Sequence, residues 1–145
     1  MYITLEDYRS YITSELLDMI LQHPDDDNTD IIGDASKFAE GTIATFAGSL
    51  YDTAGEFAKT ADDRNYLVLM WAIHIAVYII HQRIADDQVP EKVIKNYDDT
   101  IADLHKVATE DLPLNLPPAP GDSTDDPLDG GLRRMGSNTP RSHGL

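Results

Sequence analysis

Cysteine is absent from this 145-residue sequence, and basic residues are scarce. The lack of cysteine excludes disulfide bonds, thiolate metal sites and a cysteine nucleophile. Against 26 Asp and Glu residues the chain has only 11 Lys and Arg residues, which gives a formal net charge of −15. Because so acidic a surface repels polyanions, we do not expect the protein to wrap duplex DNA by neutralising its phosphates.

The motifs of common enzymes are missing as well. The sequence has no glycine-rich phosphate loop with its lysine, no HExxH and no nucleophile elbow. His74 and His81 are separated by about 10 Å along a helix axis, whereas the ligands of one zinc ion lie about 2 Å from it. The acidic stretch DDDNTD does not fit a calcium loop, because Asp30 occupies the position that requires glycine. We therefore expect no catalysis, no metal and no other cofactor.

Targeting and membrane signals are weak. The first residues, MYITLEDYRS, contain neither the basic nor the apolar segment of a secretory signal. The longest apolar stretch, from Tyr66 to Ile80, is interrupted only by His74 and is shorter than the roughly 20 residues that cross a bilayer. We therefore expect a protein that is intracellular when made and has no membrane partner.

Apolar residues recur at intervals of three and four along most of the chain, which is the spacing of amphipathic helices. No stretch shows the alternation of a strand. We predict an all-α fold, a four- to five-helix bundle with a long central apolar helix. The predicted helices begin at Thr4 in a TLED capping box, at Thr13, at Ile32, at Asp62 or Asp63, and at Pro90. Small residues on one face of the third helix, Gly41, Ala44 and Gly48, predict the close approach of another helix.

The composition changes after residue 110. Residues 111–145 hold six of the eight prolines and five of the nine glycines, so they can build neither a helix nor a core. We therefore predict a helical domain over 1–110 and an extended arm over 111–145. The end of the arm is basic because of Arg133, Arg134 and Arg141, and it could bind an acidic groove on the helical domain.

The central helix, within RNYLVLMWAIHIAVYIIHQRI, has two kinds of face. One is aliphatic and suits a core. The other is a stripe of side chains with apolar bodies and polar tips, which suits either a second layer of the domain or a subunit interface. Since a helix that is apolar all round must be surrounded, both a buried central helix and an oligomer interface remain open. The candidate interface residues are Trp71, His74, Tyr78 and His81.

Several stretches together resemble a known family. They are FAGSLYDTAGEF, DDRNYLVLMWAIHIAVYIIHQRI, PEKVIKNYDDTIADLHKV, LPLNLP and GSNTPRSHGL. This pattern is similar to that of the Mu-like prophage family of small helical head-to-tail connector or adaptor proteins of tailed phages. Leu50, where members often have Arg, and the acidic insert from Asp122 to Asp129 depart from it. The matching positions are Tyr51, Asp52, Arg64, Asn65, Tyr97 and Asp98.

The resemblance implies a structural virion protein at the head-to-tail junction, which is in the host cytoplasm during assembly. It implies a homo-oligomeric ring, of twelve copies, that docks on the portal protein and receives the tail or a further connector. Double-stranded DNA would pass through the lumen without specific binding. The alternative from charge alone is an acidic DNA-mimic inhibitor acting as a monomer or dimer, but a mimic needs compact rigid charge rather than an arm. The arm residues expected to dock are Leu132, Arg133, Arg134, Met135, Gly136, Ser137, Asn138, Arg141 and Leu145.

Overall fold

A computed structural model of the chain describes residues 1–22, 31–84 and 89–121. These ranges contain no strand, only an isolated bridge between Tyr51 and Pro118, so the predicted all-α class is confirmed. The DDDNTD stretch and every predicted docking residue from Leu132 to Leu145 lie outside the described ranges. The elements are α1 (Leu5–Arg9), α2 (Ser14–Gln22), α3 (Ile31–Ala47), α4 (Thr53–Phe57), the 3-10 helix η1 (Ala61–Asp63), α5 (Tyr66–Ile84) and α6 (Glu91–Ala108).

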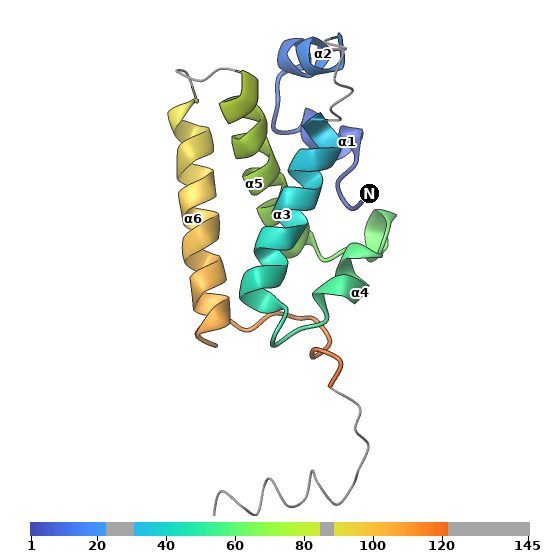
Figure 1. The fold of residues 1–145 in the computed structure, drawn as a ribbon, viewed down its shortest axis with the longest axis vertical. Coiled ribbons are helices and arrows are strands. Elements are labelled where there is room, and N and C mark those ends of the chain that lie inside the picture. Colours follow the sequence, from blue (N-terminus) through green and yellow to red (C-terminus); the bar gives the residue numbers. More distant parts are fainter. Residues whose placement is uncertain (23–30, 85–88, 122–145) are drawn as a thin grey trace, which may run out of the picture.

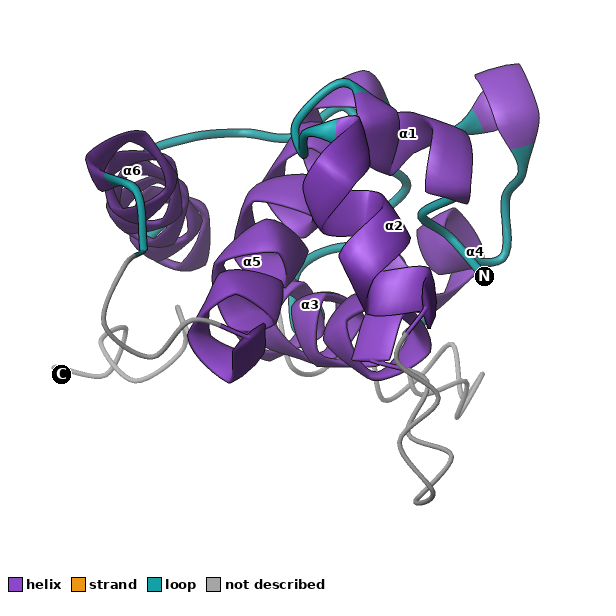
Figure 2. Ribbon diagram, turned by 90° about the horizontal axis from the view of Figure 1, so that it is seen from above, coloured by secondary structure: helices purple, strands orange, loops and turns teal. Residues whose placement is uncertain are grey.

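The three long helices α3, α5 and α6 pack side by side, each in contact with the other two (Figures 1 and 2). Every residue of α5 from Val68 to Ile80 is buried or half-buried, so most of this apolar helix is enclosed by its own chain. Tyr66–Arg83 is apolar and long enough to cross a membrane, but half of that stretch is buried in the body, as in the core helix of a water-soluble protein. The burial favours the central-helix alternative of the two that the sequence left open.

Local signals set most of the helix starts. The predicted capping box of α1 is present: the Asp7 N–H donates to Thr4 Oγ1 over 3.3 Å, and the Thr4 N–H donates to Asp7 Oδ2 over 2.7 Å. The predicted start of α5 at Asp62 or Asp63 is wrong, because both residues lie in η1. Asn65 caps α5 instead, since its Oδ1 accepts the N–H groups two and three residues ahead over 3.0 and 3.3 Å.

The segment after α3 also differs from the prediction. The helix ends at Ala47 rather than near Tyr51, and a short helix that the sequence pattern did not reveal, α4, follows. Asp52 starts α4, because its Oδ1 accepts the Gly55 N–H over 2.9 Å. The close approach predicted for the small-residue face is absent at Gly41, where nothing lies near the position of a Cβ atom. That face instead borders a shallow depression between α3 and α4.

Residues 112–119, here called the strap, run back across the end of the body (Figure 1). The Leu114 N–H donates to the Tyr51 hydroxyl over 3.0 Å, the Asp52 N–H donates to the Pro117 carbonyl over 2.9 Å, and the Ala119 N–H donates to the Leu50 carbonyl over 3.0 Å. The compact body therefore continues past the predicted domain boundary at residue 110. The leucines of LPLNLP explain this, since Leu114 is buried and Leu112 and Leu116 pack against the core.

One hydrogen bond of the strap can be tested directly. Tyr51→Phe removes only the hydroxyl that accepts the Leu114 N–H, so we expect the free energy of unfolding to fall by about 1–2 kcal/mol. The measurement is urea unfolding followed by circular dichroism. Tyr66→Phe, at a tyrosine that is 70 % exposed, is the matched control and should leave the midpoint unchanged. Equal midpoints for the two variants would show that the strap contributes nothing through this bond.

Candidate functional site

Two residues of the stripe proposed as a subunit interface, His74 and Tyr78, contact α6 of the same chain. Trp71 is 0 % exposed and belongs to the core of its own chain, so its assignment as an interface residue stays a prediction that this burial does not favour. Its indole N–H is buried and has no hydrogen-bond partner among the described residues. Stripe residues further along α5 are only half-buried, and whether they also meet another subunit stays a prediction.

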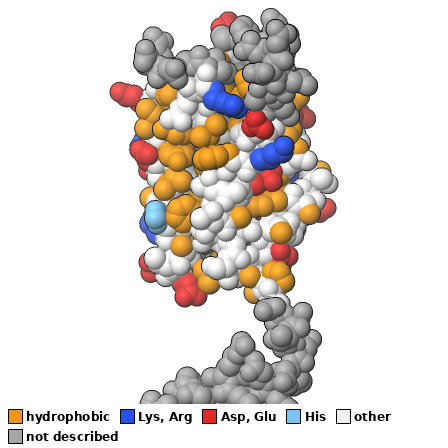
Figure 3. All heavy atoms as spheres, viewed as in Figure 1, with side chains coloured by type: hydrophobic (Ala, Val, Ile, Leu, Met, Phe, Trp, Pro, Cys, Tyr) orange, Lys and Arg blue, Asp and Glu red, His pale blue; other side chains and the backbone are white. Residues whose placement is uncertain are grey.

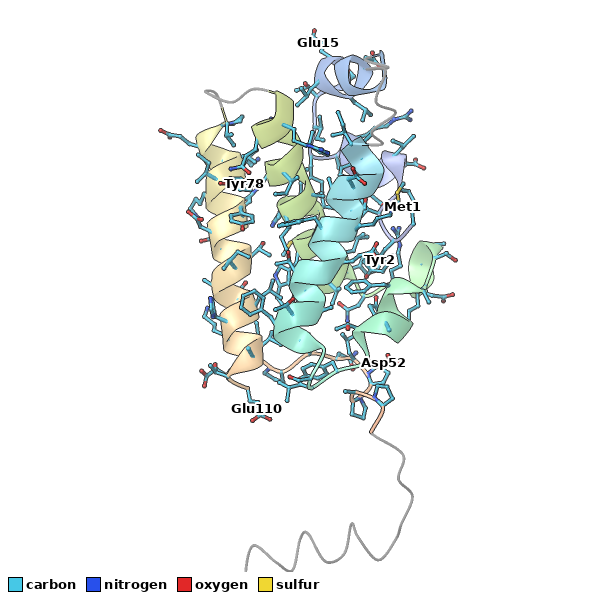
Figure 4. The ribbon with its side chains drawn as sticks, in the orientation of Figure 1. Met1, Tyr2, Glu15, Asp52, Tyr78 and Glu110 are labelled. Atoms are coloured by element: carbon cyan, nitrogen blue, oxygen red, sulfur yellow. The ribbon has the colours of Figure 1, made fainter. Side chains whose placement is uncertain are left out.

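The rest of the stripe makes specific contacts. His74 Nδ1 lies 3.0 Å from Thr100 Oγ1 of α6, and the His74 ring meets the Tyr11 ring edge to face. Tyr78 stacks on Tyr97 with 4.0 Å between ring centroids, on the side of α5 that faces α6 (Figure 4). These contacts join α5 to α6 through polar and aromatic groups, beside a small cavity of about 70 Å³.

Burial lowers the pKa of His74 and of His81 below the ordinary value, while the Asp99 carboxylate partly opposes the effect at His74. Below about pH 6.5 the unfolded chain therefore takes up protons that the folded chain does not, and stability falls as the pH falls. We expect the urea midpoint to decrease from about pH 7.5 to about pH 5.5. His74→Gln should reduce that decrease, whereas the control Ala102→Gln, at an exposed position of α6, should retain all of it. A decrease of the same size in both variants would contradict the assignment.

A second polar group, here called the clasp, joins the N-terminal segment to α4 and to the start of α5. Its centre is Glu56, a carboxylate only 1 % exposed. Glu56 accepts hydrogen bonds from the Tyr2 hydroxyl and the Lys59 ammonium, each over 2.7 Å, and from the Asn65 N–H. Burial alone would raise the pKa of Glu56, but these three donors outweigh it and hold the pKa below its usual value. Figure 4 shows Tyr2 lying beside α4.

Arg64 forms the other half of the clasp. Its guanidinium holds the Asp7 carboxylate through two contacts of 2.7 and 3.2 Å and donates to the Tyr2 carbonyl over 2.8 Å. Its Nε donates over 2.8 Å to the carbonyl of Ala61, a residue in the left-handed region at φ 51°. Burial would raise the pKa of Asp7, yet the hydrogen bonds from Arg64 and Thr4 lower it. The clasp therefore fixes the N-terminus on the body.

Most of the positions singled out by the family resemblance therefore have structural roles. Arg64 and Asn65 belong to the clasp and to the cap of α5. Tyr51 and Asp52 hold the strap, and Asp52 also caps α4. Tyr97 stacks on α5, whereas the neighbouring Asp98 is exposed and makes no ion pair in the described ranges.

Apolar side chains gather on the face of the molecule that Figure 3 shows, and the surface between α3 and α6 is here called the α3–α6 groove. Its α3 wall is the line Asp34, Phe38, Thr42, Phe46, whose members are one helical turn apart. Asp34 at one end pairs with Arg83 of α5 at 3.6 Å, and Phe46 at the other meets His105 of α6 with 4.8 Å between ring centroids. The contacts at both ends show that this wall faces α5 and α6.

The α6 wall follows from the same spacing. Ile94 and Ile101 lie on the line that leads to His105. Ile79, half-buried and one turn before Arg83, lies on the line of α5 that leads to the Arg83–Asp34 pair. Phe38 is 54 % exposed and Ile94 is 39 % exposed, so the described chain leaves the groove open. Sequence periodicity could not reveal this groove, because it depends on which helices become neighbours.

No group of three or more metal-ligating side chains occurs within residues 1–22, 31–84 and 89–121. A family model described as Bacteriophage Mu, Gp36 matches residues 2–128, which include the whole described body, the clasp and the strap. No curated protein and no solved structure matches the chain.

Proposed function

The chain belongs to the bacteriophage Mu Gp36 family, and from this membership we propose that it is a structural virion protein, the subunit of a head-to-tail connector ring. The ring docks on the portal and joins it to the tail or to the next ring, without a catalytic step, a cofactor or a membrane. The observation that carries the proposal is the family match over residues 2–128. Membership shows that the chain is a protein of Mu-like phages, and the connector role is what we propose beyond it.

The surface of the body supports an assembly role. Phe38 and Ile94 are exposed apolar side chains on a body whose formal charge is strongly negative. Copies arranged head to tail around a closed ring can bury such a surface against different parts of their neighbours. We propose a ring on this basis, and the number of twelve copies rests on the family resemblance alone.

The charge has a use in the same ring. Acidic helix faces that line the lumen repel the phosphates of passing DNA, which prevents tight binding that would stall ejection. A ring whose lumen proved neutral or basic would contradict this use of the charge.

The first test asks whether the protein is part of the particle. Mass spectrometry of purified virions should find the chain in a fixed ratio to the portal protein, and native mass spectrometry of the chain mixed with portal should show a ring. A DNA-mimic inhibitor would instead be missing from virions and would compete with DNA for a DNA-binding protein as a monomer or dimer. Its absence from virions would overturn the proposed function.

The second test concerns the basic end of the chain. Deleting residues 132–145 should give heads that package DNA but fail to join tails, counted by electron microscopy and as a loss of infectious titre. The matched control keeps the full length and replaces Asp122, Asp125 and Asp126 with Asn, and it should still produce tailed particles. Normal numbers of tailed particles from the deletion variant would show that residues 132–145 are not needed to join heads to tails.

A further inference from the structure

We propose that the α3–α6 groove of one copy binds the segment Leu132–Met135 from the C-terminal part of a second copy. The inference rests on the proposed function only in that a ring brings copies next to one another. The groove and the segment are both parts of this chain, so the interaction needs no other protein.

The shape and chemistry of the groove suit an extended segment with apolar side chains. Phe38 of α3 and Ile94 of α6 are exposed, and Ile79 of α5 is half-buried. The segment has the order apolar, basic, basic, apolar in LRRM, with Leu132 and Met135 at its ends. Burying those two side chains removes apolar surface on both partners from water.

The charges of the two partners are complementary. Glu91 and Asp98 lie on the same line of α6 as Ile94, one turn before and one turn after it, and neither forms an ion pair in the described part of the chain. Arg83, the nearest base of α5 to the groove, already pairs with Asp34. The acids along the rim are therefore available to the paired arginines of LRRM, which favours charge-assisted hydrogen bonds.

The described chain leaves the body away from its own α6. From the end of α6 the strap crosses the body to the turn between α3 and α4, where the Ala119 N–H bonds the Leu50 carbonyl. The described chain leaves the body there, on the far side from α6 (Figure 1). The residues between Gly121 and Leu132 can extend at most about 40 Å, which is enough to reach an adjacent subunit. That length also reaches the chain's own groove, and the proposed ring, which places copies side by side, favours the second copy.

The test uses the absence of cysteine in the full-length protein. One chain carries Met135→Cys and a second, enlarged by a fusion tag, carries Ile94→Cys. They are mixed at about 1 mM in total, where a dissociation constant in the millimolar range still gives substantial occupancy, and treated with a short thiol-to-thiol crosslinker. We expect a covalent heterodimer in at least about fivefold higher yield than with the control Asp62→Cys, which places the thiol on exposed η1. Phe38→Cys, on the opposite wall, is the second reporter and does not depend on the folding of the first.

The arginines provide a separate readout. Replacing Arg133 and Arg134 with Glu in the Met135→Cys chain should lower the heterodimer yield about tenfold, and adding Asp98→Lys to the groove chain should recover part of it. Equal yields from groove and control positions, or no heterodimer, would overturn the proposal. So would a chain with both Met135→Cys and Ile94→Cys that crosslinks only within itself.

The outcome is independent of the virion test. If the crosslink is lost and the protein is present in virions, the proposed binding to the groove is overturned and the proposed function stands. If the crosslink is specific and the protein is absent from virions, the proposed function is overturned and the groove stands as a self-association surface.

Discussion

Replacing Glu56 with alanine is expected to lower the free energy of unfolding by about 3–5 kcal/mol, a large part of the stability of a domain of this size. The carboxylate accepts hydrogen bonds from Tyr2, Lys59 and the Asn65 N–H in a buried position. Alanine removes the acceptor and leaves these donors, one of them charged, without it. Because they come from three separate segments, the loss should loosen the N-terminus, α4 and the start of α5 together.

Urea unfolding followed by circular dichroism measures the effect. Glu40→Ala, at a half-buried glutamate of α3, is the matched control and should change stability by no more than about 0.5 kcal/mol. Glu56→Gln keeps one acceptor oxygen but loses the charge opposite Lys59, so its stability should fall between those of wild type and Glu56→Ala. If Glu56→Ala unfolds at the same urea concentration as Glu40→Ala, the clasp does not stabilise the fold.

The pH dependence of the clasp gives an additional check. The folded-state pKa of Glu56 is below its ordinary value, so its contribution is complete above the unfolded pKa of about 4.3 and is lost as the pH falls through the folded pKa. This loss begins at lower pH than the histidine effect, which begins near pH 6.5. Glu56→Gln should therefore flatten only the acidic part of the stability curve.

Replacing Trp71 with alanine should have an effect of similar size, about 3–5 kcal/mol, because it leaves a cavity in the centre of the core. Trp71→Phe should cost much less, about 1–2 kcal/mol, because phenylalanine fills most of the space and the indole N–H that it removes has no partner among the described residues. The comparison of the two variants separates the contribution of side-chain volume to stability from that of the indole N–H.

The protein has a single tryptophan, so circular dichroism rather than intrinsic tryptophan fluorescence must follow this unfolding. Leu67→Ala, at the exposed beginning of α5, is the matched control and should cost less than about 1 kcal/mol. A Trp71→Ala protein as stable as Leu67→Ala would mean that the core does not depend on this side chain, which would contradict its burial.

The helices were largely predictable because their signals are local. The capping box of α1 involves only Thr4 and the residues up to Asp7, and helical periodicity placed α3, α5 and α6. Prediction was less accurate at the ends of the helices. Asn65 rather than Asp62 or Asp63 caps α5, and Pro90 is the cap of α6 rather than a residue of its first turn. The residues of α4 were missed because five residues are too few to show a period.

The candidate site was less predictable. The periodicity of α5 identified the stripe from Trp71 to His81, but it could not say that α6 of the same chain would cover it. Nothing in the neighbourhood of Glu56 marks it as buried, since its partner Tyr2 stands 54 positions away. The LPLNLP stretch was assigned to the arm from its prolines, yet its leucines and its backbone hydrogen bonds to Tyr51 and Asp52 fix it to the body.

The sequence by itself determined the acidic charge, the all-α class and the resemblance to Mu-like phage proteins that the family match confirms. These properties depend on composition, on spacing within a few turns and on short stretches of residues. Only the tertiary structure decided that Trp71 is core, that Arg64 and Glu56 clasp the N-terminus, and that Phe38 of α3 and Ile94 of α6 stay exposed. The physical reason is that each of these depends on residues far apart in the chain, whose meeting is fixed by the packing of whole helices.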